Sequence, residues 1–399
     1  MDDPGKSAPP CSGLRILDFT SVVSGPFCTQ ALGDFGADII KLEGLAGDMS
    51  RSTSGPFHGG LSGFFSQFNR NKRSIALDLK RDAGIEVVRR LARGADVVVE
   101  NFRPDVMDRL GIGYEALREI NPGLIYVAIS GFGPDGPYAP LPAYDHVVQG
   151  LAGMMPAQGG AGAPQMFRTV VADKAAGMTA LAAVLAALLA RERRGSRAVT
   201  GQRIDVPMLD AYAAFILPEL MGPVSFPDSD DGIPPFDLFR VYPTKDGHVV
   251  GMVVQDEQYA GLCDALGRPD LRDDPRFAHL AERFRNIDLL SEILMDEFRR
   301  RPTAALIEAL REAGAPFAPV NDFDAFLADD QVRHSALVGV IEDPEVRVRV
   351  LRAPARLSKT PLAPPRRPPR LGEHTDDVLA LAGHSPAEIA ELRERGVVA

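Results

Sequence analysis

The stretch 14-LRILDFTSVVSGPFCTQALGDFGADIIKLE-43 contains two short apolar runs with a longer segment between them. The runs LRILDF (14–19) and ADIIKLE (37–43) are rich in Ile and Leu and are typical of buried strands. TQALGDFG (29–36) lies between them and ends in glycine, as helices commonly do. A strand, a helix and a second strand predict a parallel pair joined by a crossover. The stretch therefore predicts the first unit of an α/β fold.

The same alternation continues as far as residue 130. Two further strand-like runs follow, each preceded by a helical segment that ends near a glycine: ADVVVEN (95–101) after DAGIEVVRRLARG (82–94), and LIYVAIS (124–130) after YEALREINPG (114–123). This pattern predicts a doubly wound parallel sheet, in which ligands gather at the carboxyl ends of the strands. We therefore expect three loops to surround one crevice: Thr20–Pro26, Asn101–Pro104 and Gly131–Tyr138.

The rest of the chain predicts a second, smaller unit. A long apolar helix and the strand-like GQRIDVPM (201–208) precede a Pro- and Asp-rich linker at 222–235. After the linker come a hairpin with a Lys-Asp-Gly turn and three helices, at 240–254, 256–267, 285–301 and 302–314. A basic, Pro-rich connector at 352–370 leads to two short helices. The predicted organisation is a disordered tail at 1–12, a large domain at 13–215, a linker at 216–235, a small α+β domain at 236–325, and a linker and C-terminal segment at 326–399 that returns to the large domain.

Composition narrows the class of protein. The net charge of −10 argues against a general nucleic-acid binder, which needs an excess of Lys and Arg. Three widely spaced cysteines suggest neither a disulfide framework nor a zinc site, and they favour the cytoplasm. The start of the chain has no apolar core like that of a secretory signal. The longest apolar run, Ala175–Ala190, is short for a membrane span, so we expect a buried helix and no membrane association.

One glycine pattern and the spacing of the histidines give little support to a dinucleotide site or a metal site. GFGPDG (131–136) matches the spacing of a dinucleotide fingerprint directly after a strand. However, Pro134 and Pro137 remove backbone donors where a helix should hold the pyrophosphate, so a nicotinamide dehydrogenase is a minor alternative. The seven histidines form no pair with metal-ligand spacing, and no metal is expected.

The stretch FNRNKRSIALDLK (68–80) concentrates positive charge in an acidic protein. Arg70, Lys72, Arg73 and Lys80 could form a landing site for phosphates, because such cations make charge-assisted hydrogen bonds to them. The alternative is a solvated loop entering a strand. Arg109 is a further candidate for the same phosphate site.

Asp173 stands at the start of the long apolar run and admits two roles. Aspartate is a preferred N-cap, so Asp173 could accept hydrogen bonds from free amides at the start of the helix. The positive end of the helix would also keep the carboxylate ionised, as a nucleophile or base requires. The two roles are compatible.

Several stretches together resemble the class III coenzyme A transferase family, which includes formyl-CoA and carnitine CoA-transferases and the 2-methylacyl-CoA racemases. The resemblance extends from about residue 12 to the C-terminus and is weakest over roughly 215–330. It is carried by LRILDFTSVVSGPFCTQALGDFGADIIKLE, FNRNKRSIALDLK, ADVVVENFRPDVMDRLGI, NPGLIYVAISGFG, DKAAGMTALAAVLAALLARERRGS with GQRIDVPMLDA, and LGEHTDDVL.

This resemblance implies a Rossmann-like large domain with a smaller α+β domain, in an interlocked homodimer. It also implies that coenzyme A is substrate and product, that an acyl-CoA and a carboxylic acid are the partners, and that no cofactor is tightly bound. Asp173 falls on the family's catalytic aspartate. The positions that match its CoA- and thioester-contacting segments are Val23, Ser24, Leu77, Asp78, Leu79, Lys80, Asn101, Phe102, Arg103, Arg109, Ala143, Tyr144 and Asp145.

The family's chemistry predicts that Asp173 attacks the thioester and passes through aspartyl anhydride and aspartyl-CoA thioester intermediates. Three departures modify this expectation. Formyl-CoA transferases hold Gln where Val23 stands, and a poly-Gly loop that is missing here, so we expect an acyl group larger than formate or oxalate. Gly44 replaces a basic residue, which removes one phosphate contact. Tyr144 stands where the racemases hold a catalytic histidine, which favours transfer over the alternative of racemisation because tyrosine ionises only near pH 10. A catalytically silent CoA-binding protein is the remaining alternative.

Overall fold

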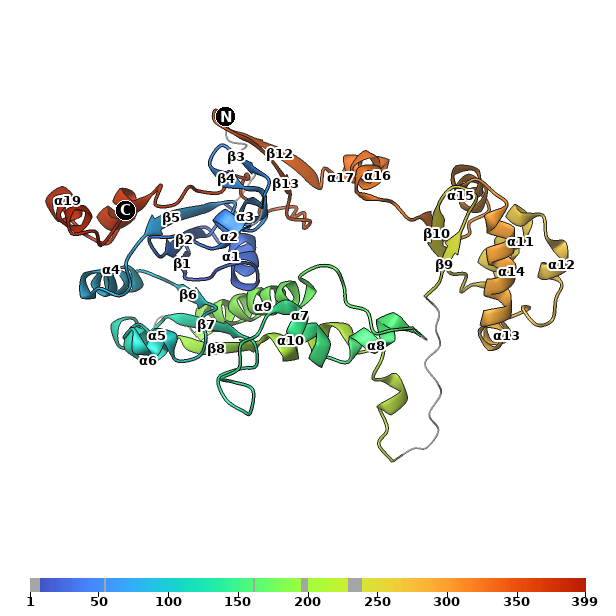
Figure 1. Cartoon of the computed structure of the whole chain (residues 1–399), viewed down its shortest axis with the longest axis horizontal. Helices are drawn as coiled ribbons and strands as arrows, with labels where there is room; N and C mark the ends of the chain where they lie inside the picture. Colours follow the sequence, from blue (N-terminus) through green and yellow to red (C-terminus); the bar gives the residue numbers. More distant parts are fainter. Residues whose placement is uncertain (1–7, 54, 161, 195–199, 229–238) are drawn as a thin grey trace. The chain divides into compact units, whose positions relative to one another are not determined.

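The computed structural model describes residues 8–53, 55–160, 162–194, 200–228 and 239–399. The chain divides into two compact units (Figure 1). Unit 1 comprises Met1–Glu219 and Ala336–Ala399, and unit 2 comprises Leu220–Ser335. Unit 2 is therefore an insertion in the sequence of unit 1.

A six-stranded parallel sheet forms the centre of unit 1. Its strands are β1 (Arg15–Asp18), β2 (Asp38–Glu43), β5 (Lys72–Ala76), β6 (Val97–Glu100), β7 (Ile125–Ser130) and β8 (Gln202–Pro207). They lie in the order β5-β2-β1-β6-β7-β8, which is the order of a Rossmann-type sheet. The predicted parallel α/β sheet is confirmed. Its chain order reverses between β1 and β6, where this architecture places its ligands.

Helices cover both faces of this sheet because the central strands are apolar on both sides. Ile16, Val97 and Val127 pack on one face against α1, α9 and α10, whereas Leu17, Val98 and Tyr126 pack on the other against α4, α6, α18 and α19. The bounds of these helices are α1 (Ser24–Asp34), α4 (Asp82–Ala92), α6 (Tyr114–Ile120), α9 (Val171–Arg194), α10 (Met208–Ile216), α18 (Thr375–Leu381) and α19 (Pro386–Glu394). Shorter elements lie in the loops: α2 (Ser50–Thr53), β3 (Phe57–His58), β4 (Leu61–Ser62), α3 (Gly63–Phe68), α5 (Val106–Arg109), α7 (Asp145–Leu151) and α8 (Met154–Gly159).

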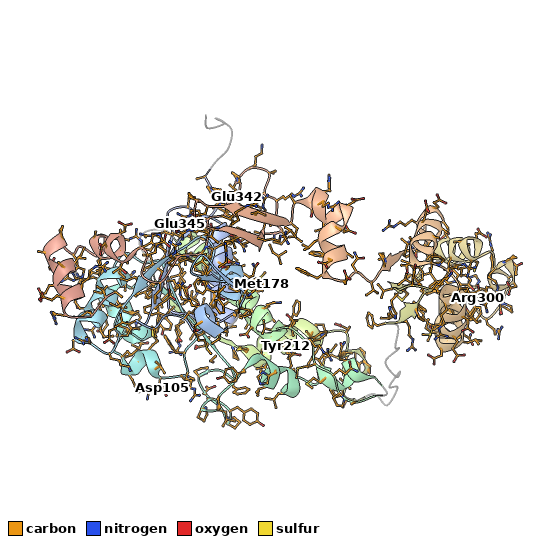
Figure 2. All side chains as sticks on the ribbon, turned by 45° about the horizontal axis from the view of Figure 1, so that its top comes forward. Asp105, Met178, Tyr212, Arg300, Glu342 and Glu345 are labelled. Carbon is orange, nitrogen blue, oxygen red and sulfur yellow. The ribbon has the colours of Figure 1, made fainter. Side chains whose placement is uncertain are left out.

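Helix α9 is the long apolar helix expected from the sequence. By length and composition its segment Val171–Arg193 could cross a membrane, but half of the apolar window is buried inside unit 1. It packs against α1 so closely that a Cβ on Gly177 would lie 2.6 Å from the Ser24 carbonyl oxygen. The opposite side of α9 exposes apolar side chains, among them Met178 and Leu189 (Figure 2 labels Met178). One side of α9 is therefore core, and the other is an uncovered apolar stripe.

The C-terminal part of the chain completes unit 1, and its helix α18 packs against β5. A hairpin that the sequence did not predict, β12 (Val338–Glu342) with β13 (Arg347–Leu351), precedes the connector at 352–370. The connector contains neither helix nor strand. The Asn71 amide donates to the Arg366 carbonyl at 3.3 Å, and the Arg366 amide donates to the Asn71 side-chain oxygen at 2.6 Å. At the very end, Val398 pairs with Leu77 and the Val397 carbonyl accepts the Asp78 amide at 2.8 Å. The last residues of the chain therefore support the segment 77–80.

Part of the segment predicted as an N-terminal tail is described by the structure. Residues 1–7 lie outside the described part of the chain. Cys11, by contrast, is buried in the core, and its amide donates to the Phe35 carbonyl at 2.8 Å. Residue 11, which the sequence assigned to the tail, therefore belongs to the core of unit 1.

Unit 2 has a small antiparallel sheet covered by helices. Its strands are β9 (Val241–Pro243), β10 (His248–Gly251) and β11 (Phe317–Pro319), in the order β11-β10-β9. The predicted hairpin at 240–254 is confirmed by the pairing of β9 with β10. The helices and one short 3₁₀ turn are η2 (Gly222–Val224), α11 (Asp256–Leu266), α12 (Pro269–Arg272), α13 (Leu280–Arg285), α14 (Ile287–Arg299), α15 (Thr303–Glu312), α16 (Phe323–Ala328) and α17 (Asp330–Ser335). Residues 229–235 of the expected linker lie outside the described residues.

Candidate active site

Asp173 lies in the first turn of α9 and faces the start of α1. Its carboxylate accepts hydrogen bonds from the hydroxyl and the backbone amide of Ser24, the first residue of α1. Gly177, one turn further along α9, permits this approach because a larger side chain would collide with α1. The carboxylate is therefore held between the amino-terminal ends of two helices, where backbone N–H groups favour negative charge.

The cap of α9 is supplied by Asp145 and not by Asp173. The Asp145 carboxylate accepts the backbone amide of Asp173 at 3.0 Å and the Gln149 side-chain amide at 2.6 Å. Gln149 in turn accepts the Phe167 amide at 3.0 Å, which fixes the segment leading into α9. The interpretation of Asp173 as an N-cap was therefore wrong, and its side chain is free for another task.

The Asp173 carboxyl is also unusual in its acidity. Burial, followed by the negative charge of Asp145, raises the pKa of Asp173 to about 7 despite the hydrogen bonds from Ser24. Burial therefore opposes the ionisation that the helix end was expected to favour. A carboxyl that titrates near neutral pH within a cluster of polar groups is typical of a catalytic residue.

Asn101 joins the loops that follow β1 and β6. Its side chain donates to the Ser21 carbonyl at 2.9 Å and to the Ser24 hydroxyl at 3.2 Å, and it accepts the Ser21 amide at 2.9 Å. Phe102, Pro104 and Pro134 line a small cavity, which brings the loop after β7 beside the loop after β6. The three loops predicted to surround one crevice thus meet at the carboxyl end of the sheet.

A family model described as CoA-transferase family III matches residues 11–375 of the chain. The chain belongs to this family. The succinate–glutarate CoA-transferase of Agrobacterium fabrum is 36% identical over 396 residues, which cover 95% of this chain and 97% of the relative. The acetyl-CoA:oxalate CoA-transferase of Acetobacter aceti is 38% identical over 328 residues, covering 80% of this chain and 82% of the relative. The crystal structure of a CAIB/BAIF family protein from Brucella suis matches with a TM-score of 0.82 and 33% identity, and covers 94% of this chain and 100% of that chain.

Membership of CoA-transferase family III confirms the resemblance seen in the sequence, and it confirms that the protein is an enzyme of the CoA-transferase type. The mixed α/β fold agrees with that of the Brucella suis protein. Within the described residues, no group of three His, Cys, Asp or Glu side chains is arranged to hold a metal ion.

The residues expected to contact CoA differ in their exposure. Val23 and Leu77 are fully buried, so neither side chain is open to a ligand in this chain. The expectation of an acyl group larger than formate or oxalate stays a prediction. Ser24 and Asp145 are also buried. The remaining predicted residues are partly or fully exposed: Asp78, Leu79, Lys80, Asn101, Phe102, Arg103, Arg109, Ala143 and Tyr144. Asp105, between Arg103 and Arg109, is labelled in Figure 2.

Two tyrosines lie near Asp145: Tyr144 precedes it in the sequence, and Tyr212 feels the charge of its carboxylate. Tyr144 is largely exposed and stacks on His146 with their ring centroids 6.0 Å apart. Tyr212 of α10, labelled in Figure 2, is fully buried, and burial and then Asp145 raise the pKa of its phenol. Tyr212 therefore stays neutral beside this acidic pair.

The basic stretch 68–80 does not form the predicted phosphate site. Arg70 pairs with Asp34, Lys72 with Asp18 at 2.9 Å, and Arg73 with Asp38 at 2.6 Å. All three cations form ion pairs with carboxylates that are distant in the sequence. Lys80 alone remains exposed from this group, and the described residues include no ion pair for it.

Sequence reasoning missed a second layer of charged residues behind the site. Four of these residues are buried: Asp18 and Glu43 end β1 and β2, Lys41 lies within β2, and Asp48 follows β2. Glu100, at the end of β6, is also buried, and burial raises the pKa of its carboxyl to about 7. A charged residue at the last position of an apolar strand was the available signal, since such a side chain needs a buried partner.

Proposed function

We propose that this CoA-transferase uses Asp173 as a covalent nucleophile and moves CoA from an acyl-CoA to a free carboxylic acid. The observation that carries the proposal is the Asp173 carboxylate facing the Ser24 amide and hydroxyl at the carboxyl end of the sheet. Direct exchange between a thioester and a carboxylate is slow because a carboxylate is a poor electrophile. An enzyme carboxylate divides the reaction into easier steps.

The proposed sequence consumes no proton overall. The ionised Asp173 attacks the thioester carbonyl, the C–S bond breaks, and CoA leaves as a thiolate from a mixed anhydride. The thiolate then attacks the aspartyl carbonyl of the anhydride, which releases the donor acid and leaves an aspartyl-CoA thioester. The acceptor carboxylate attacks this thioester to give a second anhydride and CoA thiolate. Attack of the thiolate on the acceptor's carbonyl forms the new acyl-CoA and restores Asp173.

Ser24 is placed to assist two of these steps. When the thiolate or the acceptor acid attacks the aspartyl carbonyl, negative charge develops on its oxygen. The Ser24 amide and hydroxyl already point at the Asp173 carboxyl oxygens, so they can stabilise that charge without reorganisation. Asn101 fixes the Ser24 hydroxyl from the other side.

Trapping the intermediate tests the proposal. The enzyme is incubated with candidate acyl-CoAs, quenched with hydroxylamine, and digested for mass spectrometry. An aspartyl hydroxamate at residue 173 is expected only when an acyl-CoA is present. A panel of acids should include succinate, glutarate and oxalate, since the relatives carry these names. Acyl exchange without any label at Asp173 would refute the covalent route.

Lys80 and Arg109 are proposed to hold the anionic nucleotide of CoA. Both are exposed, and the described residues give neither side chain an ion pair. Replacing either by Ala should raise KM for acyl-CoA about tenfold while changing kcat less than twofold, because an interaction equal in the ground and transition states affects binding alone. Arg93→Ala is the matched control, since it is exposed at the opposite end of the sheet, before β6. A fall in kcat with unchanged KM would place these residues in the reacting centre instead.

The pH dependence should follow Asp173. Its pKa of about 7 predicts that kcat/KM falls as pH drops below 7, because the protonated carboxyl is not a nucleophile. Asp145→Asn keeps an acceptor for the Asp173 amide but removes the negative charge. The pH below which kcat/KM falls should therefore move to a lower value. Steady-state rates between pH 5 and pH 9 measure this shift. Asp210 is an exposed acid on α10, and Asp210→Asn should leave the pH dependence of kcat/KM unchanged.

We also propose that the enzyme acts as an interlocked homodimer in the cytoplasm. The apolar stripe on α9, which includes Met178 and Leu189, and the exposed Phe215 support a partner chain, because soluble proteins seldom leave such side chains grouped in water. The three cysteines are buried and unpaired, which suits a reducing compartment.

A further inference from the structure

A buried ion pair lies directly behind the loop that leads into α1. Lys41, the fourth residue of β2, is fully buried, and its ammonium lies 3.1 Å from the Asp48 carboxylate. The same ammonium donates to the Thr20 carbonyl at 2.6 Å. Asp48 is itself fixed by the Ser50 amide at 2.9 Å and the Ser50 hydroxyl at 2.7 Å. The pair therefore forms a rigid support that reaches the loop after β1.

The loop contains a strained residue. Val22 has a φ of +66°, in the left-handed region that β-branched residues rarely adopt. Its backbone amide donates to both oxygens of Asp48, at 3.3 and 3.2 Å. A residue with this backbone persists only where its surroundings hold it there. Asp48 is the side chain that accepts the Val22 amide.

The turn at Val22 determines where α1 begins. Val23 is the N-cap residue of α1, and Ser24 follows as its first helical residue. The Ser24 amide and hydroxyl are the groups that donate to Asp173. If Val22 relaxed to an extended conformation, the chain would enter α1 in another direction and these donors would leave the carboxylate.

We propose that Asp48 is a positioning residue: held by Lys41, it keeps Val22 in the left-handed conformation and so holds the Ser24 donors against Asp173. The expected effect of Asp48 on catalysis rests on the proposed function, whereas its expected effect on the backbone does not. Asp48 does not touch Asp173 and acts through the backbone of residues 22–24.

A rescue experiment tests this role. Asp48→Asn removes the charge that attracts the Val22 amide and should lower kcat at least tenfold, with a smaller change in KM for acyl-CoA. Val22→Gly should then restore most of the lost kcat in the Asp48→Asn background, because glycine adopts a positive φ without strain. Val22→Gly alone completes the double-mutant cycle. An unchanged kcat in folded Asp48→Asn, or the absence of any rescue by glycine, would overturn the proposal.

Asp34→Asn is the matched control. Asp34 is also buried, belongs to α1 and pairs with Arg70, but it lies at the far end of the helix from Val22. Its replacement should reduce stability without lowering kcat in the folded protein, and glycine at position 22 should not recover that stability. Rescue in both backgrounds would show a general stabilising effect of glycine and would contradict the specific role of Asp48.

Hydrogen exchange keeps the test independent of catalysis. Overlapping peptides that cover residues 19–27 should exchange the Ser24 amide at least tenfold faster in Asp48→Asn than in the wild type, and at an unchanged rate in Asp34→Asn. If no acyl-CoA and acid are exchanged by the wild type, the proposed function fails, whereas this measurement still decides the role of Asp48. Equal Ser24 exchange in Asp48→Asn and the wild type would refute it.

Discussion

Replacing Asp173 with Asn is expected to lower the rate of CoA transfer at least about a thousandfold, because the amide cannot form an anhydride. Transfer between an acyl-CoA and an isotopically labelled acid, followed by mass spectrometry, measures the loss. Asn has nearly the shape of Asp and can still accept the Ser24 hydrogen bonds. The effect should therefore arise from chemistry and not from a changed structure.

The same variant should be more stable than the wild type at alkaline pH. The pKa of Asp173 rises from 3.8 to about 7 in the fold, so the folded state favours the protonated carboxyl. The stability gained from that proton is present at low pH and is lost as pH rises through about 7. Asn carries no charge at any pH, and its advantage in urea unfolding should be larger at pH 8 than at pH 5. An inactive variant that is also less stable at pH 8 would instead point to a damaged fold, and an active one would end the covalent mechanism.

Lys72→Met is expected to cause the largest loss of stability, about 3–5 kcal/mol, because it leaves the Asp18 charge buried without its main partner. Both side chains are completely buried, with the Lys72 ammonium 2.9 Å from the Asp18 carboxylate. Burial opposes ionisation of Asp18, but Lys72 and Lys41 outweigh it and lower the pKa of Asp18 to about 2. Urea unfolding at pH 7 measures the loss.

Arg118→Met provides the control for this second prediction. Arg118 pairs with Glu115 on the exposed side of α6, and such surface pairs contribute about 0–1 kcal/mol. The stability that depends on ionised Asp18 is present above about pH 4 and declines as pH falls toward 2. A loss in Lys72→Met no greater than in Arg118→Met would show that the buried pair does not stabilise the fold.

The sequence predicted the parts of the fold that depend on local pattern. The runs at 14–19, 37–43, 95–101 and 124–130 are apolar and bounded by turns, and each became a strand of the central sheet. The order of those strands depends on packing between distant segments and was not visible in the pattern. The β12–β13 hairpin, although local, was missed as well.

The same distinction applies to the site. Asp173 stood out because one carboxylate stands at the start of a long apolar run, but the cap of α9 comes from Asp145, 28 positions earlier in the chain. Likewise, Arg70 and Lys72 resembled a phosphate site only because Asp34 and Asp18 lie on other elements. Local sequence identifies charged residues, whereas their partners are chosen by the fold.

The C-terminal residues have a consequence for how this enzyme is made. The Asp78 amide pairs with the Val397 carbonyl, and Arg81 donates to the Arg395 carbonyl at 2.8 Å. During translation, the segment 77–80 leaves the ribosome before these partners, which emerge only after unit 2 has been synthesised. The segment proposed to grip the nucleotide thus completes its hydrogen bonds only after unit 2 has been made.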